Sequence, residues 1–412
     1  MNETADTAAN TGEVTAHWMR NMIVCLVGSF TTIVAMTLLL PFLPLYVEEL
    51  GVTDKAGIVQ WSGIAYGATF FAAAFVAPIW GRLGDIYGRK LMLVRASLGM
   101  TVAIGLMGMV DSVWQLVALR LFTGLAGGYA SGSMVLVATQ TPKHRVAWAL
   151  GMVSSGIMAG NLVGPLIGGA LPAIIGIRNT FLAAGGVIFL TFLATSFLIK
   201  EQKSAARKKA AKASGGWSSI EDKRPVIAML ATGMLLMLAN MSIEPIITVY
   251  VADLIDNQAN LTLISGVVMS VAALGSVLSA SRLGRLADRI GHWPVISGAL
   301  GIAALLLIPQ AFVTDAWQLI ALRFLMGVAL GGLLPCIAAV IRHSVPDAAA
   351  GGILGLSTSS QFVGQVVGPV LGGFVGGHIG MRAVFLGTCV LLAAGAVYSW
   401  MVRPRGKGPM AD

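Results

Sequence analysis

Three ionisable side chains lie within long apolar segments of the sequence: Arg120, Glu244 and Arg323. A charged side chain at the centre of a membrane costs roughly 2.5–3.5 kcal/mol on insertion scales, so each of the three is a functional candidate. A carboxyl group that is removed from water favours its neutral form, because the charged form loses its hydration. Glu244 is therefore suited to bind a proton on one side of a membrane and release it on the other.

The surroundings of Glu244 are also polar. Asn240 lies one helical turn earlier on the same face, and Pro245 leaves a backbone carbonyl without its helical partner. At about 1.5 Å of rise per residue, Arg120 and Glu244 are expected at similar depths, roughly 10 and 13 Å below the outer ends of their helices. The alternatives are a neutral, hydrogen-bonded structural acid at Glu244, and arginines that only bond helix carbonyls or cap a packing interface.

Other kinds of chemistry lack their usual residues. The histidines, which a membrane hydrolase would need at depth, all fall in predicted loops or tails: His17, His144, His292, His343 and His378. No G-x-x-x-x-G-K-[ST] phosphate loop is present, so ATP is not the expected fuel. The cysteines at positions 25, 336 and 389 indicate neither a disulfide framework nor a metal site. We expect no enzyme activity and no cofactor, with a proton gradient as the energy source.

The composition excludes a soluble globular protein. Of 412 residues, 56 % are hydrophobic and 11 % are charged, whereas about a quarter of the residues of a soluble domain are charged. The net charge of +9 does not point to nucleic acid, because no basic surface with interleaved aromatic residues stands out. The polar segment 1–17 does not resemble a cleavable signal peptide. The sequence predicts an integral membrane protein.

Twelve apolar runs reach the length of about 20 residues that a membrane-spanning helix needs. The expected spans are 19–47, 57–81, 91–110, 113–140, 146–172, 179–199, 225–251, 261–283, 294–313, 316–341, 349–375 and 381–402. The runs are continuous rather than alternating, which favours helices over a barrel. Lysine and arginine gather in the loops on one side, as cytoplasmic loops do, so both termini are expected in the cytoplasm.

The two halves of the chain repeat each other. The segment W-Q-L-V-A-L-R at 114–120 recurs 203 residues later as W-Q-L-I-A-L-R at 317–323. The constant spacing predicts two homologous halves in parallel repeat with a cavity between them. The predicted domains are an N-terminal six-helix half over 1–199, a basic cytoplasmic linker over 200–224, and a C-terminal six-helix half over 225–412. The repeat position of Glu244 holds Leu40, so duplication does not explain the acid.

The turn after the second span, G-R-L-G-D-I-Y-G-R-K over 81–90, predicts a conformational gate. Its glycines, Gly81 and Gly88 among them, allow a tight turn at the membrane edge. Asp85 can lie at a positive helix N-terminus or pair with Arg89. The alternative is an ordinary basic turn that fixes topology. The second copy of this turn, over 284–293, ends in His292-Trp293 instead of Arg-Lys.

The fifth span has one face without side chains, which allows the backbone of a neighbouring helix to approach and seal the cavity. Gly156, Gly160, Gly164 and Gly168, spaced by four, form this face, and Pro165 and Gly169 accompany it. The alternative is generic packing of small residues, which is common in membrane helices. A second copy of the pattern lies over 364–373.

These patterns resemble the major facilitator superfamily, and within it the twelve-helix drug:proton antiporters. The likeness is carried by P-F-L-P-L-Y-V-E at 41–48, G-R-K-L-M-L at 88–93 and A-W-A-L-G at 147–151. The turn at 81–90 is similar to G-x-L-A-D-R-x-G-R-K, and 160–169 meets the antiporter signature G-x-x-x-G-P-x-x-G-G in full. Arg120 resembles the arginine of R-x-x-Q-G, which implies a part in proton movement, although Thr123 replaces the glutamine.

The resemblance implies an all-α membrane protein with twelve transmembrane helices in two homologous six-helix halves. A cavity for lipophilic ligands is expected to be lined by apolar and aromatic side chains, with adaptable methionines and a few polar contacts. The candidates are Asn240, Met36, Phe30, Met237, Met241, Phe362, Gln361 and Gln365. The alternative for these residues is contact with lipid or with a neighbouring helix.

The sequence therefore predicts a proton-coupled exporter of amphipathic drug-like compounds that works by alternating access. Glu244 and Arg120 are the predicted proton-coupling residues. The alternatives are an exporter of a defined metabolite, such as a sugar or an amphiphile, and a transport-inactive membrane sensor. The expected partners are small amphipathic substrates, protons and the lipid bilayer, and the expected form is a monomer in the bacterial inner (plasma) membrane.

Overall fold

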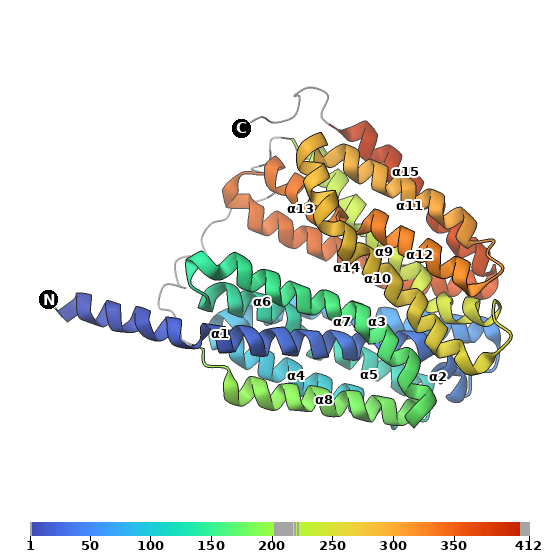
Figure 1. Ribbon diagram of the computed structural model, residues 1–412, viewed down its shortest axis with the longest axis horizontal. Coiled ribbons are helices and arrows are strands. Elements are labelled where there is room, and N and C mark those ends of the chain that lie inside the picture. The colour runs from blue at the N-terminus through green and yellow to red at the C-terminus, as the bar shows by residue number, and fades with distance from the viewer. Residues whose placement is uncertain (1, 202–216, 218–219, 221, 404–412) are drawn as a thin grey trace. The chain divides into compact units, whose positions relative to one another are not determined.

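The computed structural model describes residues 2–201, 217, 220 and 222–403, which fold almost entirely into helices (Figure 1). The helices are α1 (Asn2–Thr37), α2 (Leu43–Glu49), α3 (Lys55–Tyr87), α4 (Arg89–Met107), α5 (Val113–Ala126), α6 (Tyr129–Gln140), α7 (Val146–Ile175), α8 (Ile177–Leu198), α9 (Arg224–Ala252), α10 (Leu261–Ile290), α11 (His292–Gln310), α12 (Ala316–Leu330), α13 (Leu333–Ser344), α14 (Asp347–His378) and α15 (Met381–Val402), with short 3₁₀ helices η1 (Leu40–Phe42), η2 (Lys143–Arg145) and η6 (Gln258–Asn260). None of the described residues forms a β-strand. The predicted all-α class is confirmed.

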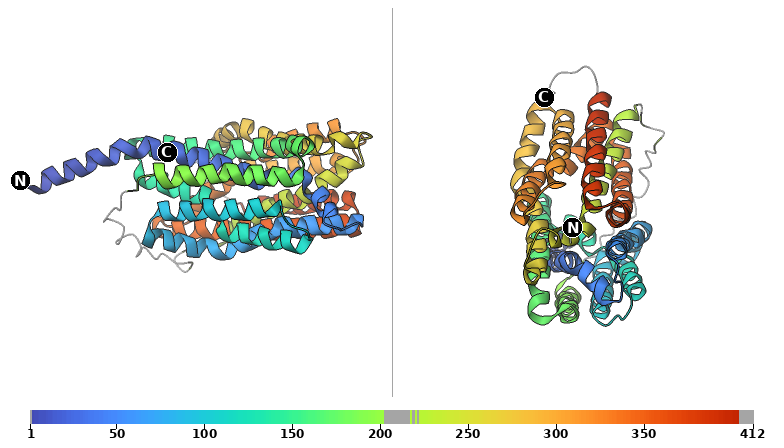
Figure 2. Two further views of the ribbon diagram at one scale, coloured as in Figure 1. Left: turned by 90° about the horizontal axis from the view of Figure 1, so that it is seen from below. Right: turned by 90° about the vertical axis from the view of Figure 1, so that its right-hand side faces the viewer.

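Eleven helical segments within the described residues are long and apolar enough to cross a membrane. They correspond to eleven of the twelve predicted spans. The remaining span, 349–375, corresponds to α14, a continuous helix of 32 residues. Within each part of the chain the long helices run side by side (Figure 2).

The chain divides into two compact units. Unit 1 comprises residues 1–39 and 72–208, and unit 2 comprises residues 40–71 and 209–412. The units differ from the predicted sequence halves in one segment, because residues 40–71 pack with the C-terminal residues. Helix α3 therefore gives its first part to unit 2 and its second part to unit 1. Most of the predicted linker, 200–224, lies outside the described residues.

In unit 1, α1 packs along α7 and α4 packs along α8. Cys25 of α1, Leu93 of α4 and Val153 of α7 lie in one fully buried apolar cluster. Tyr129 of α6 is also buried there, and its hydroxyl shares a hydrogen bond of 2.7 Å with the hydroxyl of Thr195. The polar tip of this ring is thus satisfied inside an apolar core.

The glycine face of α7 lies directly on the backbone of the first span. A Cβ atom added at these glycines would meet successive backbone oxygens, in the order Gly156 to Leu26, Gly160 to Phe30, Gly164 to Val34 and Gly168 to Leu38. The matched spacing on the two segments means that their backbones stay in contact over about three helical turns. Pro165 and Gly169 are buried in the same helix.

Helix α14 of unit 2 uses its glycines on two sides. One row lies on the backbone of α9, in the order Gly364 to Met234, Gly368 to Leu238 and Gly372 to Ser242. A second row faces the first part of α3, where Gly373 and Gly377 meet the carbonyl oxygens of Val59 and Ala56, and Gly63 meets that of Pro369. Close backbone contact therefore fixes α3, α9 and α14 against one another.

The fourth span of each sequence half is broken into two helices. Hydropathy predicts single helices over 113–140 and 316–341, because a break of one or two glycines does not interrupt an apolar run. In unit 1 the break falls at Gly127 and Gly128, where Gly128 has a φ of +104° that favours glycine. In unit 2 it falls at Gly331 and Gly332.

We expect the substitution Gly168→Val to destabilise unit 1 by about 1–3 kcal/mol, because the added side chain meets backbone that must move. Gly151→Val is the matched control on the same helix, since nothing lies within 4 Å of a Cβ atom there. The measurement is thermal unfolding of the purified proteins in detergent. Equal melting temperatures for the two variants would contradict the packing argument.

Candidate functional site

Glu244 lies on a partly exposed side of α9. Met237, Asn240, Met241 and Glu244 share one helical face and are partly exposed, whereas Ser242 and Ile243 beside them are buried. The Oε2 atom of Glu244 is nevertheless enclosed and has no hydrogen-bond partner among the described residues. The carboxyl therefore stands at the border between the packed helices and this accessible face.

Arg323 of α12 supplies the opposite charge that acts on Glu244 within unit 2. Its side chain is 3 % exposed, and its Nε and Nη2 atoms are enclosed without a hydrogen-bond partner among the described residues. A buried donor or acceptor without a partner costs free energy, and binding a proton or a polar ligand recovers part of that cost. The arrangement can therefore bind a proton or a hydrogen-bonding solute at Glu244.

Arg120 lies in α5 of unit 1 and is one of the largest fully buried side chains, at 2 % exposure. Of the two deep arginines, Arg323 is the one that shares a unit with Glu244. The part of Arg120 in proton movement stays a prediction.

The gate turn joins α3 to α4 in unit 1. Asp85, in the last turn of α3, forms an ion pair with Arg89 at the start of α4. Gly88 between the helices has a φ of +103°, a conformation that side chains other than glycine rarely adopt. Gly81 has open space around it. Of the two positions expected for Asp85, the structure shows the one in which it pairs with Arg89.

A second carboxylate, Glu201, lies at the N-terminus of α4. Its Oε1 atom accepts the backbone N–H of Arg89 at 2.8 Å, and its Oε2 atom accepts that of Lys90 at 2.7 Å. These N–H groups have no partner within the helix, and the helix dipole favours a negative charge there. The adjacent Lys200 is held by Asn21 of α1, which accepts its N–H at 3.1 Å and donates to its carbonyl at 2.8 Å.

The contacts of Glu201 fasten the start of the predicted linker to the gate turn. Sequence reasoning missed this residue, because it assigned the segment 200–224 by its basic charge alone. The only trace in the sequence is an acid that directly follows the sixth span and precedes a run of cations.

Arg95 braces the broken span of unit 1. Its Nη1 and Nη2 atoms donate to the carbonyls of Leu125 and Gly127, at 3.1 and 2.9 Å. Its guanidinium lies 3.6 Å from the centre of the Trp80 ring, and the indole N–H of Trp80 donates to the carbonyl of Leu125 at 2.8 Å. Sequence reasoning did not single out Arg95, because the break whose carbonyls it bonds is invisible in hydropathy.

The predicted cavity residues are distributed over both units. Phe30 and Met36 lie in α1 of unit 1, and the others lie in α9 and α14 of unit 2. The Cβ atoms of Met237 and Met241 pack on Gly364 and Gly368. All eight residues are partly exposed, in agreement with a lining position or with contact to lipid: Phe30, Met36, Met237, Asn240, Met241, Gln361, Phe362 and Gln365.

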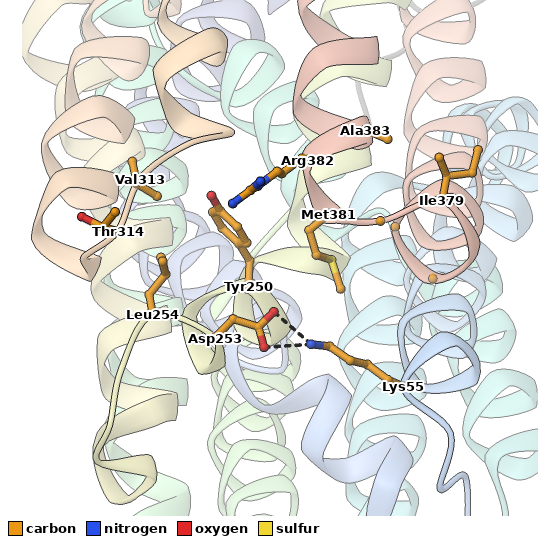
Figure 3. Close-up of a pocket in the computed structure, with 13 residues that line it drawn as sticks. Lys55, Tyr250, Asp253, Leu254, Val313, Thr314, Ile379, Met381, Arg382 and Ala383 are labelled. Carbon is orange, nitrogen blue, oxygen red and sulfur yellow. Dashed lines mark hydrogen bonds and ion pairs between the residues drawn. The ribbon is translucent and has the colours of Figure 1, made fainter.

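A cavity of about 680 Å³ opens at one end of unit 2, between the end of α9 and the start of α15 (Figure 3). At its edge the Nζ atom of Lys55 lies 2.8 and 2.9 Å from the two carboxylate oxygens of Asp253. Lys55 comes from the N-terminal half of the sequence and Asp253 from the C-terminal half. Tyr250 stands beside them, with its hydroxyl bonded to the carbonyl of Gln310 at 2.8 Å. The ion pair of Lys55 and Asp253 ties the first turn of α3 to the end of α9.

The family model of the Major Facilitator Superfamily matches residues 25–316 and 263–411 of the chain. The chain belongs to the Major Facilitator Superfamily. The two matched ranges overlap and together cover nearly all of the described residues. The family that the motifs predicted is thereby confirmed.

Curated relatives within the Major Facilitator Superfamily carry the name Multidrug resistance protein MdtG. The protein of this name from Enterobacter lignolyticus (strain SCF1) is 41 % identical over 384 residues, which are 93 % of this chain and 92 % of the relative. The protein from Salmonella paratyphi C (strain RKS4594) is 41 % identical over 389 residues, which are 94 % of this chain and 96 % of the relative.

Solved structures of transporters share the fold at low identity. A bacterial homologue of the human lysosomal transporter Spinster, in an inward-facing and occupied conformation, has a TM-score of 0.77 at 14 % identity and covers 92 % of this chain and 96 % of its own. The nucleoside transporter NupG has a TM-score of 0.72 at 13 % identity and covers 93 % of this chain and 100 % of its own. At such identities the likeness shows the fold alone, which is compatible with many substrates.

We expect Glu201→Ala to expose the first backbone amides of α4 at the turn over 81–90. Loss of an acceptor at a helix N-terminus costs about 1 kcal/mol. The hydrogen-exchange rates of the backbone N–H groups of Arg89 and Lys90 should therefore rise about fivefold. Hydrogen–deuterium exchange of a peptide spanning 84–95 measures this, with Glu49→Ala as a control at a distant exposed acid. Unchanged exchange in the Glu201 variant would show that its carboxylate does not hold the turn.

Proposed function

We propose that the protein is a proton-coupled secondary active exporter of amphipathic drug-like compounds, working by alternating access between two six-helix halves. The observation that carries this proposal is the enclosed, unpartnered Oε2 atom of Glu244 beside a partly exposed face of α9, with the opposite charge of Arg323 acting on it. Membership of a transporter superfamily and 41 % identity to proteins named for multidrug resistance support it.

The outward flux of solute and the inward flux of protons are coupled because the solute and the proton compete for the carboxyl of Glu244. An ionised Glu244 offers its Oε2 atom as an acceptor to a solute that enters from the cytoplasm. A proton that arrives from the outside neutralises the carboxyl and removes that acceptor, so the solute is released. Arg323 then carries a charge that its neighbour no longer compensates, which favours return to the state in which Glu244 loses its proton.

The substrate range follows from the side chains around the carboxyl. Met237 and Met241 flank Asn240 and Glu244 on one helical face, so an adaptable apolar surface adjoins two polar groups. Amphipathic compounds match this combination, since one part can pack on the thioethers while another bonds to the polar groups. An exporter of one defined metabolite uses the same mechanism and remains the second candidate.

Two ion pairs are assigned to the gates. Asp85 and Arg89 hold the turn that the basic loops predict to be cytoplasmic, and Lys55 and Asp253 lie at the opposite ends of their helices. We assign the second pair to the outer gate, because it joins the two halves of the sequence. The protein acts as a monomer in the bacterial inner membrane with both termini in the cytoplasm, and Arg120 assists proton movement.

The Glu244→Gln variant keeps the shape of the side chain but cannot ionise. In liposomes with an acidic interior, a transported compound should release protons through the wild type, while the variant falls to the level of protein-free liposomes. A pH-sensitive dye measures this, with Glu49→Gln as the matched control. Equal release through both proteins would move the coupling site elsewhere. No response of the wild type to lipophilic cations or neutral drugs would favour a dedicated metabolite or a sensor.

Reversal of one charge in the proposed outer gate should impair turnover, and reversal of both should restore it. Lys55→Asp and Asp253→Lys each bring like charges together, and an exposed pair of this kind changes an equilibrium by about two- to fivefold. The double variant regenerates an opposite pair in reversed order. Turnover in liposomes is the measurement, and a double variant as slow as the slower single variant would refute a gating role.

A further inference from the structure

The second copy of the gate turn carries a histidine where the first copy carries an arginine. The segment G-R-L-G-D at 81–85 recurs as G-R-L-A-D at 284–288, and the repeat position of Arg89 is His292. Both turns have the same backbone signature, because Gly88 and Gly291 have φ values of +103° and +95°. In both, the acid and its basic partner are four residues apart across the junction of two helices.

The geometry of the second turn keeps this correspondence. The Nε2 atom of His292, the first residue of α11, lies 3.9 Å from the Oδ1 atom of Asp288 in the last turn of α10. The His292 side chain is 23 % exposed and that of Asp288 is 73 % exposed, so water and protons reach the pair. The first turn holds a permanent cation, whereas the second holds a group that changes charge between about pH 5 and 8.

A second histidine faces the first from a neighbouring helix. The ring of His343, near the end of α13, is centred 6.1 Å from the ring of His292. Helices α10, α11 and α13 pack against one another in unit 2. The two imidazoles therefore form a cluster with Asp288 on three helix ends.

We propose that His292 is a regulatory proton site: a proton bound there closes the pair with Asp288 and holds the second gate turn. This inference rests on the proposed function, in which the turn belongs to a transport gate. It is separate from Glu244, which lies in the last third of α9. The proton gives His292 the charge that Arg89 always has, so the two gate turns are alike only at acidic pH.

The cluster is surrounded mainly by cations. Besides the cluster itself, the charged or titratable residues of its helices are Arg282, Arg285 and Arg289 of α10 and Cys336 and Arg342 of α13, while the helices packed on α11 carry Arg323 of α12 and Arg382, Cys389, Tyr398 and the adjoining Arg403 of α15. Asp288 is the acid within the cluster, so it favours a proton on His292. The cations and a protonated His292 oppose a positive charge on His343.

The consequence is feedback on transport. An exporter that takes in protons acidifies the side on which this turn is predicted to lie. Protonation of His292 then stabilises the closed turn and slows the cycle. Because the pair is exposed, the effect is expected to be about two- to fivefold.

The first test follows the proton itself and does not need transport. Histidine ring signals of the purified protein are recorded by NMR between pH 5 and 8, and the His292 signal is assigned by its loss in His292→Gln. Asp288→Asn should move the His292 midpoint to lower pH, and His343→Gln should move it to higher pH. His378→Gln should leave the His292 midpoint unchanged, because His378 lies on α14, outside the cluster, and stacks on Phe374 of the same helix. A midpoint that ignores Asp288→Asn overturns the proposal.

The second test measures turnover in liposomes while pH is varied only on the side of the α10–α11 turn. The wild type should slow about two- to fivefold as this side becomes acidic. Turnover of the His292→Arg variant should be slow at every pH, and turnover of the His292→Gln variant should be fast at every pH. The His378→Gln variant should have the pH profile of the wild type. A wild-type pH profile in both His292 variants overturns the regulatory role. If no compound is transported, the proposed function fails and the NMR titration alone decides whether the proton site exists.

Discussion

A charge enclosed between membrane helices must meet an opposite charge or bind a proton, and the arrangement of Glu244 and Arg323 depends on this constraint. Both residues are held by helices whose positions are set by backbone contacts, because glycines place α14 directly on α9 and α12 directly on α10. The distance between the two charges is therefore a property of helix packing. A proton on Glu244 would change the electrostatic energy of that packing, which is the physical basis of the proposed coupling.

Close backbone contact recurs where helices must stay together. Helix α7 lies on the first span, and α14 lies on both α9 and the first part of α3, in each case through glycines spaced by four. Lipid does not drive apolar helices together, so the association depends on van der Waals contact, which bulkier residues would prevent. The contact of α3 with α14 explains why residues 40–71 belong to a unit otherwise made of C-terminal residues.

The two sequence halves keep the same order of helices, but their residues differ at the helix ends and at the breaks in the fourth spans. Trp80 and Arg95 brace the broken span of unit 1, whereas their repeat positions in the second half hold Leu283 and Gly298. In the first gate turn Asp85 pairs with Arg89, and in the second Asp288 lies near His292, the residue at the repeat position of Arg89. Duplication supplied two equivalent frameworks, and substitutions at a few positions gave them different polar contacts.

The sequence by itself determined the membrane class, the spans, the repeat and the superfamily, because hydropathy, loop charge and motif spacing are local properties of the chain. It also singled out Glu244, since one acid in an apolar run is visible without a structure. Only the tertiary structure decided that the charge of Arg323 acts on this acid, that Glu201 holds the start of α4, that Lys55 meets Asp253 and that glycines interrupt the fourth spans. These contacts join residues on different helices or depend on backbone dihedral angles, and no pattern along a single segment encodes them.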